Sequence, residues 1–324
     1  MKRNYLDEIA QIKERNGWST QLGLRFRLIE LKKQFDNLLT ITDINIDKLE
    51  LAKYFLIATV ASGELYFRSI SRSFIDAGEP YSKNAGKFNQ TQNIKFDFEI
   101  VNAIHGKSVT IGEIISHMLP FNNLEDVNSN ISTIIGKDLL SEIKKFNKRT
   151  KIFEDYNQAI ENFHLHHQII LADVKRLYEL RHIFCHEFGT LLSTDLDELY
   201  KVFCNAIIFF VVCEWYLNNE LYPNSPETSS DMIKRAVDIF EKSEKELEEV
   251  IMSIRKSNDS KQNEYFENII TKWKEYREMS SNYSGSLFDF GALQPILQIT
   301  EKAILTDDFR TNLLRHPIFI DKKK

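Results

Sequence analysis

Three residues near the middle of the chain combine side chains that can bind an anion and move a proton. They are Arg181, His182 and His186, in the sequence LYELRHIFCHEFG that runs from Leu177 to Gly189. A guanidinium can bind an anion through two parallel hydrogen bonds, and an imidazole can exchange a proton near neutral pH. The two histidines are four residues apart, which places them on the same face of a helix, one turn apart.

Arg181 lies within a stripe of apolar residues that recur every three or four positions. The members of this stripe are Ile170, Leu171, Val174, Leu177, Phe184 and Phe188. Burying an unpaired charge is costly, so Arg181 must be hydrogen-bonded or must face a cleft or a partner. On spacing alone two interpretations stay open: a functional guanidinium, or an arginine held by a core carboxylate beside two surface imidazoles.

The familiar motif for binding a nucleotide phosphate is absent. Gly86-Lys87 and Gly106-Lys107-Ser108 both begin like a phosphate-binding loop, which needs another glycine five residues earlier. Tyr81 and Val101 occupy those positions, so neither segment can form the loop.

The sequence also lacks a recognisable metal site or nucleophile. His164 and His167 share a helical face, but no acidic or thiol residue at matching spacing completes a ligand set. There is no GxSxG motif, and the three cysteines are Cys185, Cys204 and Cys213, which we interpret as reduced thiols. We therefore predict no metal and no cofactor.

Composition favours a helical protein and limits the ways in which it can bind nucleic acid. The 324 residues include only 11 glycines and 6 prolines, and so few turn formers favour long helices. With 42 Lys+Arg against 47 Asp+Glu, the net charge is -5, which excludes a broad basic surface but leaves room for a local basic patch. We expect an all-α fold.

Helical periodicity predicts the elements that must position these side chains. One helix is expected from Asp47, which has capping-box spacing to Glu50, as far as Asp76. A long exposed loop is expected over residues 77–93, and a long helix over 157–188. A further helix, from Asp195 to about Asn219, has an unbroken apolar run too short to span a bilayer, so we expect a buried core helix.

The chain is expected to form two domains, residues 1–222 and 223–324, because Pro, Ser and Asn concentrate between Leu221 and Asp231. The N-terminal segment carries charges such as Asp7 and Lys13 where a signal peptide needs an apolar stretch. We therefore expect a cytoplasmic protein with no membrane association.

The segment from Arg181 to His186 matches an R-x4-6-H motif, and the chain around it resembles the HEPN domains. These are all-helical domains, many of them metal-independent ribonucleases of toxin–antitoxin and phage-defence systems. The segments Leu51–Ile70, which contains Glu64, and Ser108–Leu140 resemble other parts of the same domain. The resemblance covers about residues 45–220 and implies a HEPN-like helical bundle followed by a smaller C-terminal helical domain.

The resemblance implies an endoribonuclease that needs no metal, because RNA supplies its own nucleophile in the 2′-hydroxyl. His186 would then take or give the proton, and Arg181 would stabilise the charge of the transition state. His182 would be an accessory acid, base or phosphate contact, and Glu64 would orient Arg181. The alternative is a catalytically silent HEPN protein that serves as a binding or dimerisation module in a defence complex.

Helical geometry constrains how Arg181 and His186 can act together. Five residues of regular helix rotate the chain by roughly 500°, which leaves the two side chains about 140° apart. Either the helix is distorted around Ile183 to Cys185, or two subunits share the site. HEPN nucleases pair so that their motifs line one cleft, so we expect a two-fold homodimer with this helix at its interface. The resemblance also implies an antitoxin or another defence protein as a partner.

RNA binding needs local positive charge, and the densest basic run is KKFNKRTK. We expect Lys144, Lys145, Lys148 and Arg149 of this run to contact RNA, together with Arg25, Arg27, Arg68 and Arg72. Ordinary solvated side chains are the alternative for any one of them.

The C-terminal part resembles the LprI-like lysozyme-inhibitor helical domain. The matching positions are Trp273, Tyr276, Arg277, Gly285, Thr306 and Arg310. The cysteine pair common in that family is missing here, so the resemblance does not by itself imply an inhibitor. It implies a helical module that is a candidate for docking a partner or RNA, and the alternative is a helical hairpin whose aromatic residues pack a small core.

Overall fold

The computed structural model describes residues 5–16, 23–43, 46–89, 98–106, 108–187, 193–287, 291 and 293–315. These residues form thirteen helices and no strand, which confirms the all-α prediction. The chain divides into two compact units, Met1–Pro223 and Asn224–Lys324. The division falls within the segment rich in Pro and Ser.

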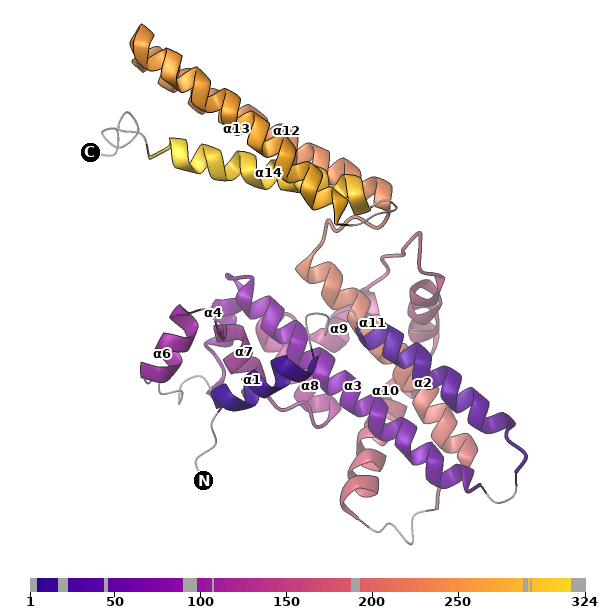
Figure 1. The fold of residues 1–324 in the computed structure, drawn as a ribbon. Helices are drawn as coiled ribbons and strands as arrows, with labels where there is room; N and C mark the ends of the chain where they lie inside the picture. The colour runs from indigo at the N-terminus through magenta and orange to yellow at the C-terminus, as the bar shows by residue number, and fades with distance from the viewer. Residues whose placement is uncertain are drawn as a thin grey trace. The chain divides into compact units, whose positions relative to one another are not determined.

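The first unit is built around four long helices that lie side by side, α2, α3, α10 and α11 (Figure 1). Shorter helices α4, α7 and α8 pack against α3, and α1 packs on α7. The bounds are α1 Tyr5–Asn16, α2 Gly23–Thr40, α3 Lys48–Asp76, α4 Tyr81–Ala85, α6 Phe98–His105, α7 Ile111–Met118, α8 Leu124–Ile135, α9 Leu139–Lys145, α10 Glu154–His186 and α11 Leu196–Leu221.

Side-chain caps start the helices that matter most for the site. Asp47 accepts a hydrogen bond from the backbone N–H of Glu50 at 3.0 Å, so α3 begins where its sequence predicts. Asp195 caps α11 in the same way, through the N–H of Glu198 at 2.7 Å. The predicted long helix is α10, which begins three residues early at Glu154. Its predicted end, Phe188, lies outside the described residues.

Helix α11 is a core helix, as its apolar run predicts. The residues that it buries include Phe203, Ala206, Phe209, Phe210, Val212, Cys213 and Leu217. In the described part of the chain, no helix combines the length and the apolar character needed to cross a membrane.

The prediction of a long exposed loop over residues 77–93 is wrong in its described part. Helix α4 forms within it, and Ala85 and Phe88 are buried in the core. The amide of Asn84 also donates to the backbone oxygen of Ile134 at 3.1 Å, which ties α4 to α8. Two apolar side chains and one amide therefore outweigh the local turn formers. Residues 90–93 lie outside the described residues.

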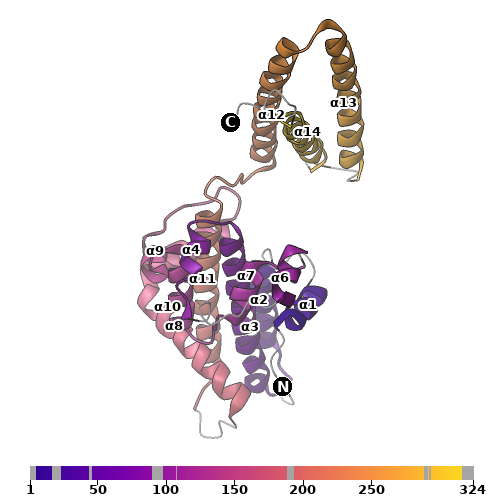
Figure 2. The ribbon, with the colours of Figure 1, turned by 90° about the vertical axis from the view of Figure 1, so that its left-hand side faces the viewer.

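The second unit is a bundle of three helices, α12 Ser229–Ser257, α13 Ser260–Ser286 and α14 Leu293–Leu313. Helix α14 packs along both α12 and α13 (Figure 2). Arg277 is buried within this bundle, where it contacts the Trp273 ring, pairs with Glu244 and donates to the Thr306 hydroxyl at 2.9 Å. A buried and paired guanidinium explains Trp273, Arg277 and Thr306 as packing residues.

Of the other positions in the LprI-like pattern, Gly285 is also buried, whereas Tyr276 is exposed. Arg310 forms ion pairs with Glu246 at 3.3 Å and Asp307 at 2.5 Å. These contacts lie within the three-helix bundle and give it stability.

Helices α3 and α11 approach closely at Gly63. A Cβ atom at this position would overlap the ring of Phe210, which is fully buried on α11. Because a packed aromatic ring cannot move cheaply, only glycine fits at this crossing. The next residue along α3 is Glu64, so the crossing also sets the position of that carboxylate.

Glu214 is a carboxyl group buried in the core. Its side chain on α11 accepts a hydrogen bond from the Tyr156 hydroxyl of α10 at 3.1 Å, and the residue is 3% exposed. Burial raises the pKa of Glu214 to about 7, against the opposing effects of the Tyr156 hydrogen bond and the nearby Arg25. The group is therefore protonated in the folded protein over a range of pH in which the unfolded chain ionises it.

Replacing Gly63 by alanine should lower the free energy of unfolding of the first unit. The overlap with Phe210 costs about 1–3 kcal/mol, which exceeds the gain of about 1 kcal/mol from better helix propensity. Gly23→Ala, at a helical glycine with open space around it, is the matched control and should cause no loss. Equilibrium urea unfolding measures both, and equal stability of the two variants would contradict this account of the crossing.

Glu214→Gln should stabilise the protein more at pH 8 than at pH 5. Since the folded pKa of Glu214 lies above its ordinary value, the wild type loses stability as pH rises from about 4.5 through 7, whereas glutamine does not titrate. The difference between variant and wild type should grow by about 2–3 kcal/mol over this range. Urea unfolding at both pH values tests it, with the exposed Glu161→Gln as control. A difference independent of pH would refute the prediction.

Candidate functional site

Arg181 lies on α10 and faces α3. Its Nη2 atom is 3.5 Å from Oε1 of Glu64, and the two side chains are 27% and 16% exposed. The structure thus brings together the arginine and the carboxylate that the sequence assigns to orient it. The same contact is also expected if a core carboxylate only neutralises Arg181. The residues around the ion pair must therefore distinguish a functional arginine from a structural one.

Glu64 stands between two guanidiniums. Burial raises the pKa of Glu64, while the positive charges of Arg181 and Arg68 lower it. Arg68 is one turn further along α3 on the same face as Glu64. One carboxylate therefore serves two cations, and the group carries a net positive charge.

Three buried polar atoms in this neighbourhood make no hydrogen bond with the described part of the protein. They are Oε1 of Glu64, Nε of Arg68 and the hydroxyl of Tyr178. Burial and then the charge of Glu64 raise the pKa of Tyr178, which places this hydroxyl beside the carboxylate. Proteins pair nearly all of their buried polar groups, so this cluster has room for further hydrogen bonds: Oε1 of Glu64 meets Arg181 only at 3.5 Å, and the other two atoms have no partner among the described residues.

The histidines of the motif lie on a different face of α10 from Arg181. His182 and His186 are both exposed, with their ring centroids 5.1 Å apart. Nε2 of His182 is 3.9 Å from Oε1 of Glu187, the residue that follows the helix. The two imidazoles are therefore close enough to act on one proton-bearing group in solvent.

Helix α10 is regular between Arg181 and His186. Within α10, only His166 has backbone angles outside the helical range, with φ -129° and ψ 18°. The sequence-based alternative of a distortion around Ile183 to Cys185 is therefore wrong. Regular geometry leaves Arg181 and His186 about 140° apart, so they do not converge within one chain.

The basic run lies near the end of α11. Lys148 donates from Nζ to the backbone oxygen of Pro223 at 3.2 Å, and its own backbone oxygen accepts from Nε1 of Trp215 at 2.7 Å. Lys144 and Lys145 end α9 and are exposed, and Arg149 is 3.9 Å from Glu161.

This run is far from Arg181, because α10 and α11 are antiparallel. Tyr156 near the start of α10 meets Glu214, whereas Arg176 meets Glu198 near the start of α11. The positions of Glu198 and Glu214 are separated by about 24 Å along a straight helix. The predicted RNA-contacting run and Arg181 therefore occupy opposite ends of this hairpin.

The remaining arginines of the predicted basic surface divide into two groups. Arg25 is held by Asp155 at 2.6 and 2.8 Å, and Arg27 pairs with Glu30 at 3.1 Å. Arg68 and Arg72, in contrast, line a cavity beside α3.

Sequence reasoning missed one member of the charged cluster, Tyr178, and named Arg68 only as a possible RNA contact, not as a partner of Glu64. Tyr178 is three residues before Arg181, and Arg68 is four residues after Glu64, so each shares a helical face with a predicted site residue. Helical spacing from the motif residues was the signal that could have placed both in the cluster.

No three side chains of His, Cys, Asp or Glu come together to form a possible metal site in the described ranges. The sequence places His164 and His167 on one helical face, and Nδ1 of His167 is 3.5 Å from the backbone oxygen of His164, so this ring nitrogen faces its own helix.

Comparison with known proteins adds no further assignment. No protein-family model matches this chain, and no curated protein or solved structure matches it either. The resemblances to HEPN and LprI-like domains therefore stay predictions that rest on the residues quoted for them.

Proposed function

We propose that this chain is a metal-independent endoribonuclease of the toxin–antitoxin or phage-defence type. The observation that carries the proposal is the charged cluster of Arg181, Glu64 and Arg68, in which one carboxylate lies between two guanidiniums and the buried Nε–H of Arg68 makes no hydrogen bond to the described residues. A guanidinium that pairs with one carboxylate still has hydrogen-bond donors without an acceptor. These donors can bind a phosphate and stabilise the charge that develops on it. The exposed imidazoles at the end of the same helix supply groups for proton transfer.

In the proposed reaction, an imidazole accepts the proton of an RNA 2′-hydroxyl, whose oxygen then attacks the adjacent phosphorus. We assign this role to His186, with Arg181 binding the non-bridging oxygens as their charge grows. The bond to the next nucleotide's 5′-oxygen breaks, and His182 gives that oxygen a proton. The products are a 2′,3′-cyclic phosphate and a 5′-hydroxyl. Glu64 acts through Arg181 as a positioning residue.

The roles of Arg181 and His186 require two subunits, since the side chains diverge within one chain. The exposed face of α10 that carries both histidines offers a surface for pairing, made of Ile169, Ala172, Lys175, Glu179, His182 and His186, and exposed Leu165 lies just before the non-helical His166. Leu165 and Ile169 are 68% and 51% exposed, which is unusual for large apolar side chains. Pairing of two chains through this face would bury them and place Arg181 near His186 of the partner subunit.

The divergence of Arg181 and His186 also favours a second candidate, a catalytically silent module that pairs or binds through α10. In this case Glu64 serves only to neutralise Arg181, and no RNA is cut. An antitoxin or another defence protein is the partner that the HEPN resemblance implies for either function. Cleavage measurements separate the two candidates.

Arg181→Ala and His186→Ala should each reduce RNA cleavage about 100-fold or more. Loss of a charge-stabilising donor or of a proton-transfer group has effects of this size. Cleavage is measured on a labelled RNA in the presence of EDTA, and the wild type should leave products ending in a 2′,3′-cyclic phosphate.

The matched controls for these variants are Arg235→Ala and His105→Ala, which change exposed residues of the same types outside the cluster. Both should cleave like the wild type. Equal cleavage by all five proteins would refute the assignment, and no cleavage by a well-folded wild-type dimer would support the silent module.

Ile169→Glu should convert a dimer into a monomer, because it places a charge in the apolar part of the proposed pairing face. Light scattering coupled to size exclusion should give twice the chain mass of 38.0 kDa for the wild type and the single mass for the variant. Ile269→Glu is the control, at an isoleucine with a similar exposure of 54% on α13. A wild type that stays monomeric at high concentration would contradict the shared site.

A further inference from the structure

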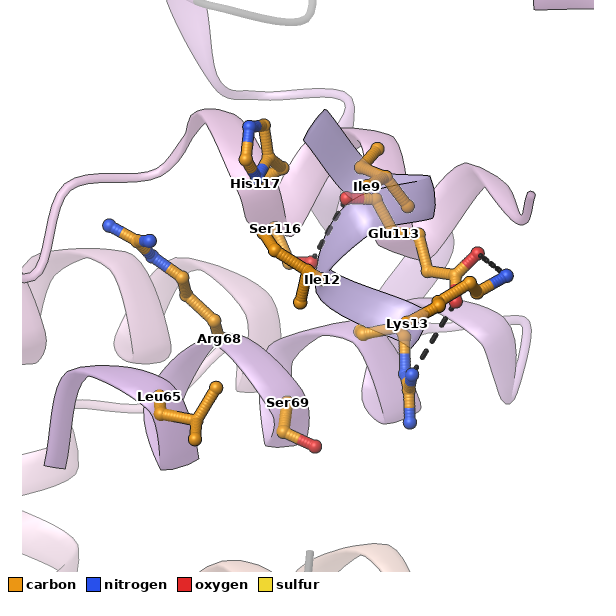
Figure 3. A pocket seen from close by; sticks show the side chains of 10 residues that line it. Ile9, Ile12, Lys13, Leu65, Arg68, Ser69, Glu113, Ser116 and His117 are labelled. Atoms are coloured by element: carbon orange, nitrogen blue, oxygen red, sulfur yellow. Dashed lines mark hydrogen bonds and ion pairs between the residues drawn. The ribbon is translucent and has the colours of Figure 1, made fainter. Parts of the chain in front are cut away.

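A cavity of about 120 Å³ lies between α1, α3 and α7 (Figure 3). Its apolar wall is formed by Ile9 and Ile12 of α1 and Leu65 of α3. A cavity needs only about 10–15 Å³ of such volume to hold one water, so this cavity has room for several waters or for one group of phosphate size.

The charged side chains that line the cavity are more often positive than negative. Glu113 of α7 is its only carboxylate among the described lining residues, and its side chain is 9% exposed. Glu113 pairs with Lys13 at 2.8 Å and with Arg72 at 3.5 Å. Arg68 is the third cation, so three cations face one carboxylate.

The imidazole of His117 also lines the cavity. Its Nε2 atom is 2.6 Å from Oε2 of Glu8. Lys13 and Arg72 both pair with Glu113, whereas Arg68 forms no ion pair with Glu113.

Arg68 is the cation with unused binding capacity. In Figure 3 its side chain extends from α3 away from Glu113 and Lys13. Its Nε–H is buried and makes no hydrogen bond to the described protein, although the charge of Glu64 is near. A buried charged donor without an acceptor is costly, and an anion in the cavity would supply one.

The backbone around the cavity is firmly held, so its shape does not depend on the anion. Asp76 at the end of α3 accepts hydrogen bonds from Gly112 N–H at 2.9 Å and from the Thr110 hydroxyl at 2.7 Å. Thr110 and Glu113 also cap each other at the start of α7. Gly112 permits this approach, because a Cβ atom there would lie 2.6 Å from the backbone oxygen of Arg72.

We propose that this cavity binds the phosphate group of a nucleotide, with Arg68 as its principal ligand and the attached nucleoside outside the cavity. The nucleotide is either one unit of an RNA strand or a free mononucleotide. Binding of an RNA strand in this cavity rests on the proposed function, since Glu64 connects Arg68 to Arg181. Binding of a free phosphate group does not depend on ribonuclease activity.

Titration calorimetry with adenosine 5′-monophosphate, inorganic phosphate, adenosine and a ten-nucleotide RNA tests the proposal. Wild-type protein should bind the monophosphate and inorganic phosphate, more weakly as salt rises, and should bind adenosine at least about tenfold more weakly than its monophosphate. Arg68→Gln should weaken binding of the monophosphate about tenfold or more. Arg68→Lys keeps the positive charge but loses the planar guanidinium that can donate two parallel hydrogen bonds, so this variant should retain part of the affinity for the monophosphate.

Arg235→Gln, the same substitution at an exposed arginine outside the cavity, should bind like the wild type. Thermal unfolding of each variant confirms that it is folded. If RNA binds in a way that depends on Arg68, and if the monophosphate displaces the RNA, then the bound phosphate group belongs to an RNA strand. Binding of the monophosphate without RNA binding identifies the free nucleotide. Unchanged affinity in Arg68→Gln, equal affinity for adenosine, or no binding of any probe would overturn the proposal.

The two proposals fail separately. If the wild type binds the monophosphate through Arg68 but cuts no RNA, the cavity stands and the proposed ribonuclease falls. If Arg181→Ala abolishes cleavage while no phosphate binds in the cavity, the ribonuclease stands and the phosphate site falls.

Discussion

The contact between α3 and α11 at Gly63 determines where the charged residues of α3 can lie. With no side chain at this position, the Phe210 ring sits directly on the backbone of α3 and fixes the rotation of the helix. Glu64 then faces α10, and Arg68, one turn later, reaches the cavity beside α1 and α7. A single apolar contact in the core thereby positions both the proposed catalytic cluster and the proposed phosphate site.

The two units hold their arginines in different surroundings. Arg277 in the second unit is buried, and Glu244, Thr306 and the Trp273 ring all contact it, although its Nε–H makes no hydrogen bond to the described residues. Arg181 is more exposed and has one carboxylate that it shares with Arg68. An arginine with such incomplete pairing retains the capacity to bind an anion from outside.

Much of the fold could be predicted from local sequence, whereas the cluster could be predicted only in part. Few glycines and prolines indicate long helices, and Asp47 marks the start of α3 through its own side chain. The hydrophobic run of α11 indicates a core helix for the same local reason. The pairing of Glu64 with Arg181 was expected from the resemblance to HEPN domains, not from spacing.

The parts that could not be predicted depend on contacts between segments distant in the sequence. The cavity joins α1, α3 and α7, and nothing near Lys13 indicates that it meets Glu113. Helix α4 formed where turn residues predict a loop, because Ala85 and Phe88 find a place in the core. Whether a charged side chain has a partner within the protein likewise depends on how the helices pack, so it could not be predicted from local sequence.

The crossing at Gly63 has a consequence for how this protein can evolve. Position 63 cannot gain a methyl group while position 210 holds a phenylalanine, so substitutions at the two positions are coupled rather than independent. Among descendants of this sequence, alanine or serine at 63 should accompany a smaller residue at 210. Such covariation would reveal the α3–α11 crossing from sequences alone, 147 residues apart along the chain.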